Sequence, residues 1–480
     1  MEPGGGDAFE NLNEEERDAL NEATQLGFPL YDWFLHKSLD DGALPILAPL
    51  VSALDPSYFT DFWTLPGYLG SDPNGSAVRD RIRLKSSVSA VYVDGKERQS
   101  GNSASTGVDQ AWQRGRTDGK IEIELENGPL NDAYVCGTDA YIYGTTLEML
   151  SGEAKGFKAP LESVKNGRLA FSPGFGIEGM LEQISLIKPG DLASLDNSDY
   201  IAIQTYHRHQ LPDESYIGWD QFRDESGAPI YPQRKILTGP LVALGGAGSI
   251  QSGDFSGKMI LLGALMDESA FPWQADWYRN KTKEFADDSR FRIWYIDHAI
   301  HGDLSSVPGA HHLVPYLGAL HQALLDLSDW VERGIEPLSS SVYSIVKGQV
   351  KVPEKAQERL GVQPVVHLKA NGSDSVAVGV GETVLFTADV ELPEGAGRFT
   401  SAEWSFDGFE HTFSTDAYPI KGIFIDMNET GTKSSVQSQY AFSHPGTWFP
   451  VLRVSSQRQG DASEIFTQVK NLGRVRVTVR

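Results

Sequence analysis

The chain has almost no cysteine and far fewer basic than acidic residues, and each shortage excludes a class of protein. The single cysteine, Cys136, excludes an internal disulfide framework and a cysteine-rich zinc site. The formal net charge of −24 argues against nucleic acid and anionic membranes as partners, because both are bound through basic patches. Favourable partners are therefore neutral or cationic.

Long apolar runs and a basic leader are also missing. No stretch reaches the ~20 apolar residues that a membrane-spanning helix needs, and residues 1–17 are acidic rather than basic and then apolar. We therefore expect no transmembrane segment and no export signal, and the sequence does not indicate a compartment. The 49 glycines and 25 prolines predict many turns and much β structure.

Changes in residue pattern divide the chain into the segments of a multidomain α+β protein. Several domains are also expected from the length of the chain, since a domain usually has ~150 residues. The predicted parts are a helical, lid-like segment (1–80), a small antiparallel β domain (81–204), an α/β portion with a preceding loop (205–337), a linker (338–362) and an immunoglobulin-like β-sandwich (363–480).

The first segment predicts two helices. Asn13 is a good cap for a helix over Asn13–Gln25, which begins with three glutamates and ends at Gly27. A second helix is predicted over Leu44–Leu54. The aromatic run Ser57–Leu69 is too apolar for a free surface, so we expect it to cover a core or to line a cleft.

Short alternating runs separated by Gly, Asn and Asp follow over Arg81–Gln204, and this pattern is typical of antiparallel strands. Within this domain, Ser100–Lys120 is polar and Gly-rich and predicts a loop. The next stretch, Tyr200–Gly239, is polar, aromatic and rich in turn residues.

His207 and His209 stand two residues apart in this stretch, so on a strand they would point the same way and could share a metal ion. No third ligand follows at short spacing, so we predict no metal site and favour an ordered polar or substrate-facing loop. Arg208, Arg223 and Arg234 are candidates for binding an anionic group, although paired or solvated arginines are the ordinary alternative.

The segment Gly239–Gly257 predicts a Gly- and Ser-rich loop near an active site. It does not match a phosphate loop, because no Gly-Lys-Ser or Gly-Lys-Thr ending is present. The two serines Ser249 and Ser252 lie in or beside it.

The stretch Lys258–His301 has the order strand, acid, helix, strand, histidine. Met259–Leu265 is an uninterrupted apolar run, typical of a strand covered on both faces, and Phe291–Ile296 is a second apolar run. Asp267 follows the first strand and His301 follows the second. Catalytic groups gather at the carboxyl ends of strands in α/β sheets, so this placement indicates a site.

The intervening helix is predicted over Ala270–Ala286 and places Trp273 and Trp277 on one side. A further helix over Leu313–Arg333 has leucines at helical spacing, and we expect it to pack on the sheet through them. His321 within this helix is an ordinary core or surface histidine. The prolines and serines of Ile335–Gly361 then predict an extended linker.

The last quarter of the chain resembles a PKD domain, a β-sandwich family. The resemblance rests on AEWSFDG at 402–408, followed by Tyr440-Ala441-Phe442 and Pro445-Gly446-Thr447-Trp448. Ser405 stands where the family has Asp, and the glycine is shifted by one residue. The resemblance implies a spacer or binding module.

Residues 253–337 resemble the carboxyl-terminal part of α/β-hydrolases of the tannase and feruloyl-esterase type. The shared order is a lysine and apolar strand ending in Asp267, paired aromatics Trp277-Tyr278, a strand with Arg292, then His301, and a closing helix over residues 313–334. The resemblance implies a carboxylic ester hydrolase in which Asp267 orients His301 and the histidine takes a proton from a nucleophile. His298 is the rival to His301.

The chain departs from this family in having no Gly-x-Ser-x-Gly nucleophile elbow. Residues 1–252 also lack the alternating strands and helices of an earlier sheet and look like an inserted lid. The nucleophile is therefore not identified, and Ser249, Ser252 and Cys136 are the weak candidates. The chain is either the carboxyl-terminal part of a longer protein or a pseudoenzyme.

Two functions stay open. The first is an esterase-like hydrolase that acts on a small neutral ester once a nucleophile is supplied, with no cofactor, and with Trp273, Trp277, His207 and His209 as substrate-binding residues. The second is a noncatalytic protein whose β domains bind carbohydrate or protein, in which Asp267 caps the following helix and both histidines are packed or solvated. The sequence predicts that Asp267 and His301 lie within hydrogen-bond reach, and it does not indicate an oligomeric state.

Overall fold

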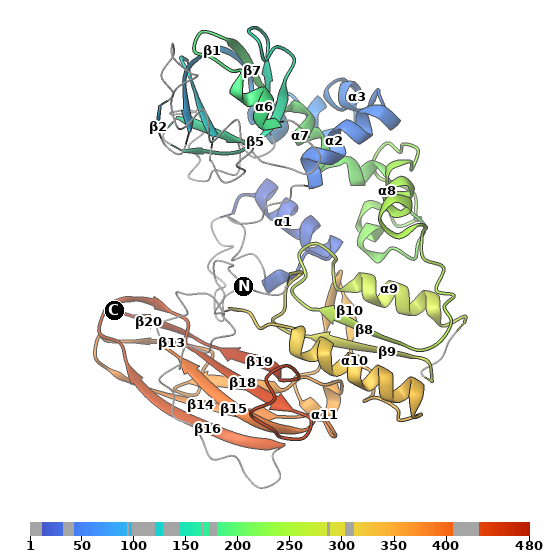
Figure 1. Ribbon diagram of the computed structural model, residues 1–480, viewed down its shortest axis with the longest axis vertical. Coiled ribbons are helices and arrows are strands. Elements are labelled where there is room, and N and C mark those ends of the chain that lie inside the picture. Colours follow the sequence, from blue (N-terminus) through green and yellow to red (C-terminus); the bar gives the residue numbers. More distant parts are fainter. Residues whose placement is uncertain are drawn as a thin grey trace. The chain divides into compact units, whose positions relative to one another are not determined.

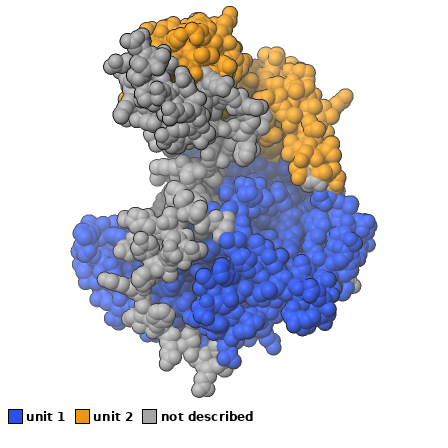
Figure 2. All heavy atoms as spheres, viewed as in Figure 1, with its two compact units in different colours: residues 1–38, 214–221, 251–480 blue, residues 39–213, 222–250 orange. Residues whose placement is uncertain are grey.

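The computed structural model describes residues 12–31, 43–93, 96–97, 121–127, 145–165, 167–171, 180–285, 289–302, 312–406 and 432–480. The protein is a mixed α+β molecule with one curled antiparallel sheet and several small sheets. It divides into two compact units, coloured blue and orange in Figure 2. Unit 1 comprises residues 1–38, 214–221 and 251–480, and unit 2 comprises residues 39–213 and 222–250. The segment 1–80, predicted as one helical part, is thus divided between them.

Helix α1 (Glu14–Leu26) confirms the first predicted helix. Its start is fixed by a capping box: Asn13 accepts a hydrogen bond of 2.9 Å from the Glu16 amide, and Glu16 accepts one from the Asn13 amide. Gly27 ends the helix at φ 115°, a left-handed conformation that glycine adopts at no steric cost. Caps of this kind stabilise a helix by about 1 kcal/mol.

The helical core of unit 2 is built from the predicted aromatic run. Tyr58 and Phe62, on helix α3, are fully buried, and the Tyr58 hydroxyl donates to the Ala202 carbonyl at 2.6 Å. The aromatic run is therefore a packing element. The helices around this core are α2 (Ala43–Leu54), α3 (Tyr58–Thr64), η3 (Leu69–Ser71), α4 (Ser76–Arg79) and α7 (Ser198–Gln204).

The predicted antiparallel β domain is a seven-stranded sheet in the order β2-β1-β3-β6-β5-β4-β7. The first half of β1 pairs with β7 and its second half pairs with β3, so the sheet curls back on itself around one apolar core. Residues 100–120 and Cys136 lie outside the described residues. The strands are β1 (Arg83–Val93), β2 (Lys96–Glu97), β3 (Ile121–Leu125), β4 (Thr146–Met149), β5 (Lys158–Lys165), β6 (Arg168–Phe171) and β7 (Leu192–Asp196), and the short helix α6 (Met180–Ser185) precedes β7.

The Gly- and Ser-rich segment after Gly239 was wrongly predicted as a loop, because it contains helix α8 (Thr238–Ala247). Gly239, Gly245 and Gly246 meet no neighbour at the position of a Cβ, so these glycines mark an uncrowded face. Leu241, Ala243 and Leu244 between them are good helix formers, and Gly248 ends the helix at φ 78°. Residues 205–222, predicted as irregular, contain the short helices η7 (Tyr206–His209) and η8 (Ile217–Phe222).

Unit 1 contains the predicted strand, helix and strand. Strands β8 (Met259–Ala264) and β9 (Phe291–Ile296) are parallel and pair in register from Met259 with Phe291 to Ala264 with Ile296. Helix α9 (Trp273–Thr282) packs on one face of this two-stranded sheet and helix α10 (Leu317–Glu332) packs on the other (Figure 1). Both helices are shorter than predicted, and α9 begins after Pro272.

The face of α10 that packs on the sheet differs from the prediction. Ala319 and Ala323 reach the core beside Trp294, whereas Leu324 and Val331 of the predicted leucine stripe are exposed. The leucines are spaced as on one face of a helix. This spacing identifies a helix but does not show which of its faces packs against the sheet.

The segment predicted as a linker lies along the outer edge of β9. Ser341 donates its amide to the Ile293 carbonyl at 2.8 Å, and its hydroxyl accepts from the Tyr295 amide at 3.0 Å. The Ser340 hydroxyl accepts from the Ile293 amide at 3.1 Å. The serine run therefore closes one edge of the parallel sheet. Strands β10 (Ser344–Val346) and β11 (Gln349–Lys351) and helix α11 (Ala356–Arg359) follow.

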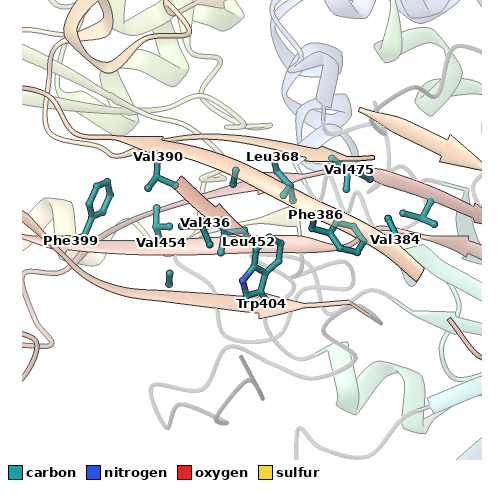
Figure 3. Packing of buried hydrophobic residues seen from close by; sticks show 14 of the residues in the cluster. Leu368, Val384, Phe386, Val390, Phe399, Trp404, Val436, Leu452, Val454 and Val475 are labelled. Atoms are coloured by element: carbon teal, nitrogen blue, oxygen red, sulfur yellow. The ribbon is translucent and has the colours of Figure 1, made fainter. Parts of the chain in front are cut away.

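The carboxyl-terminal part holds three small sheets, ordered β12-β14-β16, β13-β20-β17 and β15-β18-β19, around one shared core. Figure 3 shows that Trp404 and Phe386 lie within this core. Trp404 is almost completely buried there. The strands are β12 (Val365–Ala370), β13 (Ser375–Val378), β14 (Thr383–Glu391), β15 (Arg398–Ser405), β16 (Lys433–Ala441), β17 (Gly446–Trp448), β18 (Val451–Gln457), β19 (Val469–Arg474) and β20 (Arg476–Val479).

Membrane-spanning helices are not found in the part of the chain that the structure describes, since none of its helices is both long and apolar enough.

Candidate active site

Asp267 and His301 form a hydrogen-bonded pair at the carboxyl ends of the two parallel strands. Nδ1 of His301 lies 3.0 Å from Oδ1 of Asp267 and 3.2 Å from Oδ2. The sequence-based prediction of hydrogen-bond reach is therefore confirmed. Asp267 and His301 lie close together because β8 and β9 are parallel, so the carboxyl ends of both strands lie at the same edge of the sheet.

The carboxylate of Asp267 is held in place by its own turn. Its Oδ1 accepts hydrogen bonds from the Ser269 amide at 2.9 Å and from the Ala270 amide at 2.6 Å. Helix α9 starts only at Trp273, and its N-cap Pro272 makes no side-chain cap bond. Asp267 thus organises the turn before α9 and does not cap the helix itself.

The backbone of His301 is fixed from two sides. Its amide donates to the Glu268 carboxylate at 3.1 Å, and its carbonyl accepts from the Tyr316 hydroxyl at 3.3 Å. Sequence reasoning missed both supports. Glu268 follows Asp267 directly, but no motif marks it, and Tyr316 is placed only by the tertiary fold.

The ring of His301 is suited to accept a proton. Its side chain is 55% exposed, whereas that of Asp267 is 14% exposed. Both described ring bonds use Nδ1, so in the neutral ring Nδ1 carries the proton and Nε2 has the free lone pair. A carboxylate that holds imidazole in this tautomer is the arrangement used in general-base catalysis.

An apolar groove of about 380 Å³ runs from this pair along β8. Ile260, Leu262 and Ala264 of β8 form one wall, and α10 forms the other. The polar groups Asp267, His301 and Tyr316 lie at one end only. The α10 wall consists of Leu320, Ala323, Leu324 and Leu327, and Ile296 and Ile300 complete the lining.

The rival histidine, His298, belongs to a different network. It lies at φ 58°, and its Nδ1 is 2.9 Å from the side-chain oxygen of Asn471 on β19. Asp297 beside it faces Arg359 at 3.5 Å. Burial lowers the pKa of His298. The ring of His298 thus forms a contact between the end of β9 and strand β19.

His209 is enclosed within the aromatic core of unit 2. It is 1% exposed, stacks on Tyr68 with ring centroids 4.3 Å apart, and bonds through Nδ1 to the Pro232 carbonyl at 2.7 Å. Burial lowers the pKa of His209 to about 4. His207 instead packs near Phe222. Among the described residues, no group of three possible ligands surrounds a metal position. Substrate contact by either histidine stays a prediction.

The arginines near these histidines are engaged by other protein groups. Arg234 pairs with Asp55 and Asp61, and the bond to Asp55 is the main cause that raises the pKa of its guanidinium. Arg223 donates to the carbonyls of Pro212 and Gly227. Arg208 lies over the ring of Tyr231. The cluster holds unit 2 together through these contacts.

Trp273 and Trp277 both lie in unit 1 but in different surroundings. Trp273 is buried and donates from Nε1 to the Leu26 carbonyl at the end of α1 at 2.7 Å. Trp277 is partly buried, donates to the Ser215 hydroxyl at 3.0 Å and packs against Tyr216. Neither lines the groove beside Asp267 and His301, so substrate binding by them also stays a prediction.

Neither Ser249 nor Ser252 is among the residues that line the groove beside His301. The Ser252 hydroxyl accepts from the Asp254 amide at 3.2 Å. Cys136 lies outside the described part. Comparison with known proteins adds no assignment: no family model matches the chain, and no curated protein matches it significantly.

Proposed function

We propose that residues 205–337 are the carboxyl-terminal portion of an α/β-hydrolase-type ester hydrolase, similar to tannases and feruloyl esterases. The observation that carries this proposal is the Asp267–His301 pair, 3.0 Å apart at the ends of two adjacent parallel strands. Strand β9 has one edge closed by Ser340 and Ser341, and β8 pairs with its other edge. This arrangement fits the last two strands of such an enzyme.

The chemistry follows from the tautomer that Asp267 selects. His301 takes a proton at Nε2 from a hydroxyl nucleophile, which attacks the ester carbonyl. The protonated ring then gives this proton to the departing alcohol oxygen, which leaves an acyl intermediate and a neutral imidazole. The same nitrogen then activates water, whose attack releases the acid and restores the hydroxyl. General-base assistance of this kind contributes ~10²–10⁴ in rate. The nucleophile must be supplied from outside the described contacts of His301.

Charge and lining favour a neutral substrate. The protein carries a net charge of −24, which disfavours an anionic substrate. The groove beside the catalytic pair is apolar except at its catalytic end. A small neutral ester is therefore the substrate class that the site suits.

We further propose that residues 363–480 are a PKD-like β-sandwich. The aromatic residues on which the resemblance rests form one continuous chain of ring contacts. Trp404 stacks on Phe406 with centroids 5.5 Å apart, and Phe406 stacks on Tyr440 at 4.5 Å. The chain continues from Tyr440 to Phe442 and on to Trp448. Residues 407–408 of the same motif lie outside the described residues.

The second candidate function is noncatalytic binding of carbohydrate or protein by the β domains. One observation favours it: in the part of the chain that is described, the ring of His301 bonds only to Asp267, and no hydroxyl or thiol is held at Nε2. In this case the chain is a pseudoenzyme with a retained acid–histidine pair.

Labelling with a fluorophosphonate probe separates the two functions. The hydrolase proposal predicts that the purified chain is labelled covalently and that His301→Ala abolishes labelling. The matched control is His321→Ala, a half-buried histidine on α10 that contacts Phe466 and does not line the groove. A folded chain that is not labelled supports the noncatalytic function, and equal labelling of both variants contradicts the role of His301.

A further inference from the structure

Strand β8 has an open edge. It pairs with β9 on one side, and within the described residues no strand pairs with its other side. The amides of Met259 and Leu265 donate to the Arg290 and Ile296 carbonyls around β9. Because bonding direction alternates along a parallel strand, Ile260, Leu262 and Ala264 direct their backbone groups toward the open edge.

The side chains beside this edge are apolar but incompletely covered. Only Gly263 of the six β8 residues is buried. On α10, Leu324 is 56% exposed, and together with Leu320 and Leu327 it faces β8 across the groove. An apolar helix face and an unpaired strand edge therefore lie side by side.

This combination points to a missing neighbour. Parallel sheets are normally covered on both faces, and a sheet of two strands is only marginally stable. A row of unpaired amides and carbonyls is a template for pairing with another chain. Ser340 and Ser341 protect the outer edge of β9, whereas no comparable contact is described along β8.

We propose that the open edge of β8 binds the β8 strand of a second copy of this chain in antiparallel orientation. A twofold axis between the two Leu262 residues places the backbone N–H and C=O groups of Ile260 opposite those of Ala264 in the second copy. Ile260, Leu262 and Ala264 of both copies then make all the hydrogen bonds between the two strands. The axis is perpendicular to the sheet and keeps both α10 helices on one face. Their leucines then meet above the seam, at the outer side of each groove.

The charges at the two ends of β8 favour a second copy over a parallel strand from another protein. Lys258 precedes the strand, and Asp267 and Glu268 follow it. In the antiparallel arrangement Lys258 lies opposite Met266 of the second copy, next to the two carboxylates. A symmetric pair satisfies this complementarity twice, and isologous contacts of this kind are the commonest route to homodimers.

The test uses sedimentation velocity of the full chain from low to high micromolar concentration. The proposal predicts a monomer–dimer equilibrium, and Leu324→Lys should weaken the dimer by about tenfold or more, the usual effect of losing an apolar anchor in an interface. Leu325→Lys is the matched control, since Leu325 is also 56% exposed on α10 but does not line the groove. It should leave the equilibrium unchanged.

Hydrogen exchange supplies the second measurement. The amides of Ile260, Leu262 and Ala264 should exchange more slowly as the dimer forms, and this protection should be absent in Leu324→Lys. A chain that stays monomeric throughout the concentration range overturns the proposal. So does a dimer that Leu324→Lys and Leu325→Lys weaken equally, because its interface then lies elsewhere. Neither result bears on labelling by a fluorophosphonate.

Discussion

Nδ1 of His301 lies 3.0 Å from Oδ1 of Asp267, although the two residues stand 34 positions apart in the sequence. The pair is surface-accessible on the histidine side, so it adds little to stability: exposed ion pairs contribute about 0–1 kcal/mol. What the pair does provide is a fixed tautomer and a fixed ring orientation. Its effect on activity is therefore separable from its effect on folding.

The substitution Asp267→Asn tests the orienting role. It keeps the shape of the side chain but removes the charge that holds the Nδ1 proton, so the rate of fluorophosphonate labelling should fall by about 10²–10⁴-fold. Thermal unfolding should change little. The control is Asp254→Asn, a change at an exposed carboxylate before β8. Unchanged labelling of Asp267→Asn would exclude Asp267 from the chemistry.

His209 predicts a pH dependence of unit 2. Because its pKa is lowered to about 4 in the folded state, the unfolded chain binds an extra proton between that value and about 6.5. Stability is therefore complete above pH ~6.5 and declines as the pH falls toward ~4, by up to about 3 kcal/mol from this residue.

Urea unfolding at pH 7 and pH 5 measures this effect when the protein is compared with His209→Gln. The variant should lose less stability between the two pH values, because glutamine does not titrate. Identical losses would show that the enclosed ring is not the group responsible.

Arg234 predicts a large energetic cost of breaking an ion pair in unit 2. Its side chain is 12% exposed and neutralises both Asp55 and Asp61. Arg234→Met leaves these carboxylates unpaired and should lower the free energy of unfolding by about 3–5 kcal/mol. The neighbouring Lys235→Met, at an exposed position, should lower it by less than about 0.5 kcal/mol in the same denaturant titration. Similar losses would contradict the assigned role of the cluster.

Ser341 tests whether the predicted linker is part of the sheet. Ser341→Ala removes the hydroxyl that accepts the Tyr295 amide proton, which leaves a buried donor unsatisfied. The expected loss is about 1–3 kcal/mol in unfolding free energy. Ser339→Ala, at an exposed position of the same run, should be nearly neutral. If both changes were neutral, the segment would be a spacer after all.

The sequence predicts best where the signal is local. Two apolar runs locate β8 and β9, and a cap with its glutamates locates α1. The positions of Asp267 and His301 after neighbouring strands predict that these two side chains lie close together. Each of these features depends on residues that are close in the chain or on the geometry of one ladder.

The sequence predicts poorly where a partner far away in the chain decides the outcome. The serines after Leu338 look like a linker until β9 provides unpaired amides for them. His209 looks like a polar loop residue until Tyr68 covers it. The glycines of α8 look like a loop because their exposed position on a helix is not visible from composition.

The proposed function requires His301, and not His298, to be the base. The most direct measurement is the hydrolysis of a neutral ester, p-nitrophenyl butyrate, by the protein and by His301→Gln and His298→Gln, each checked for folding by circular dichroism. We expect His301→Gln to lose activity by about 10²-fold or more, while folded His298→Gln keeps its activity. Loss in His298→Gln alone, or equal activity in both variants, would contradict this expectation.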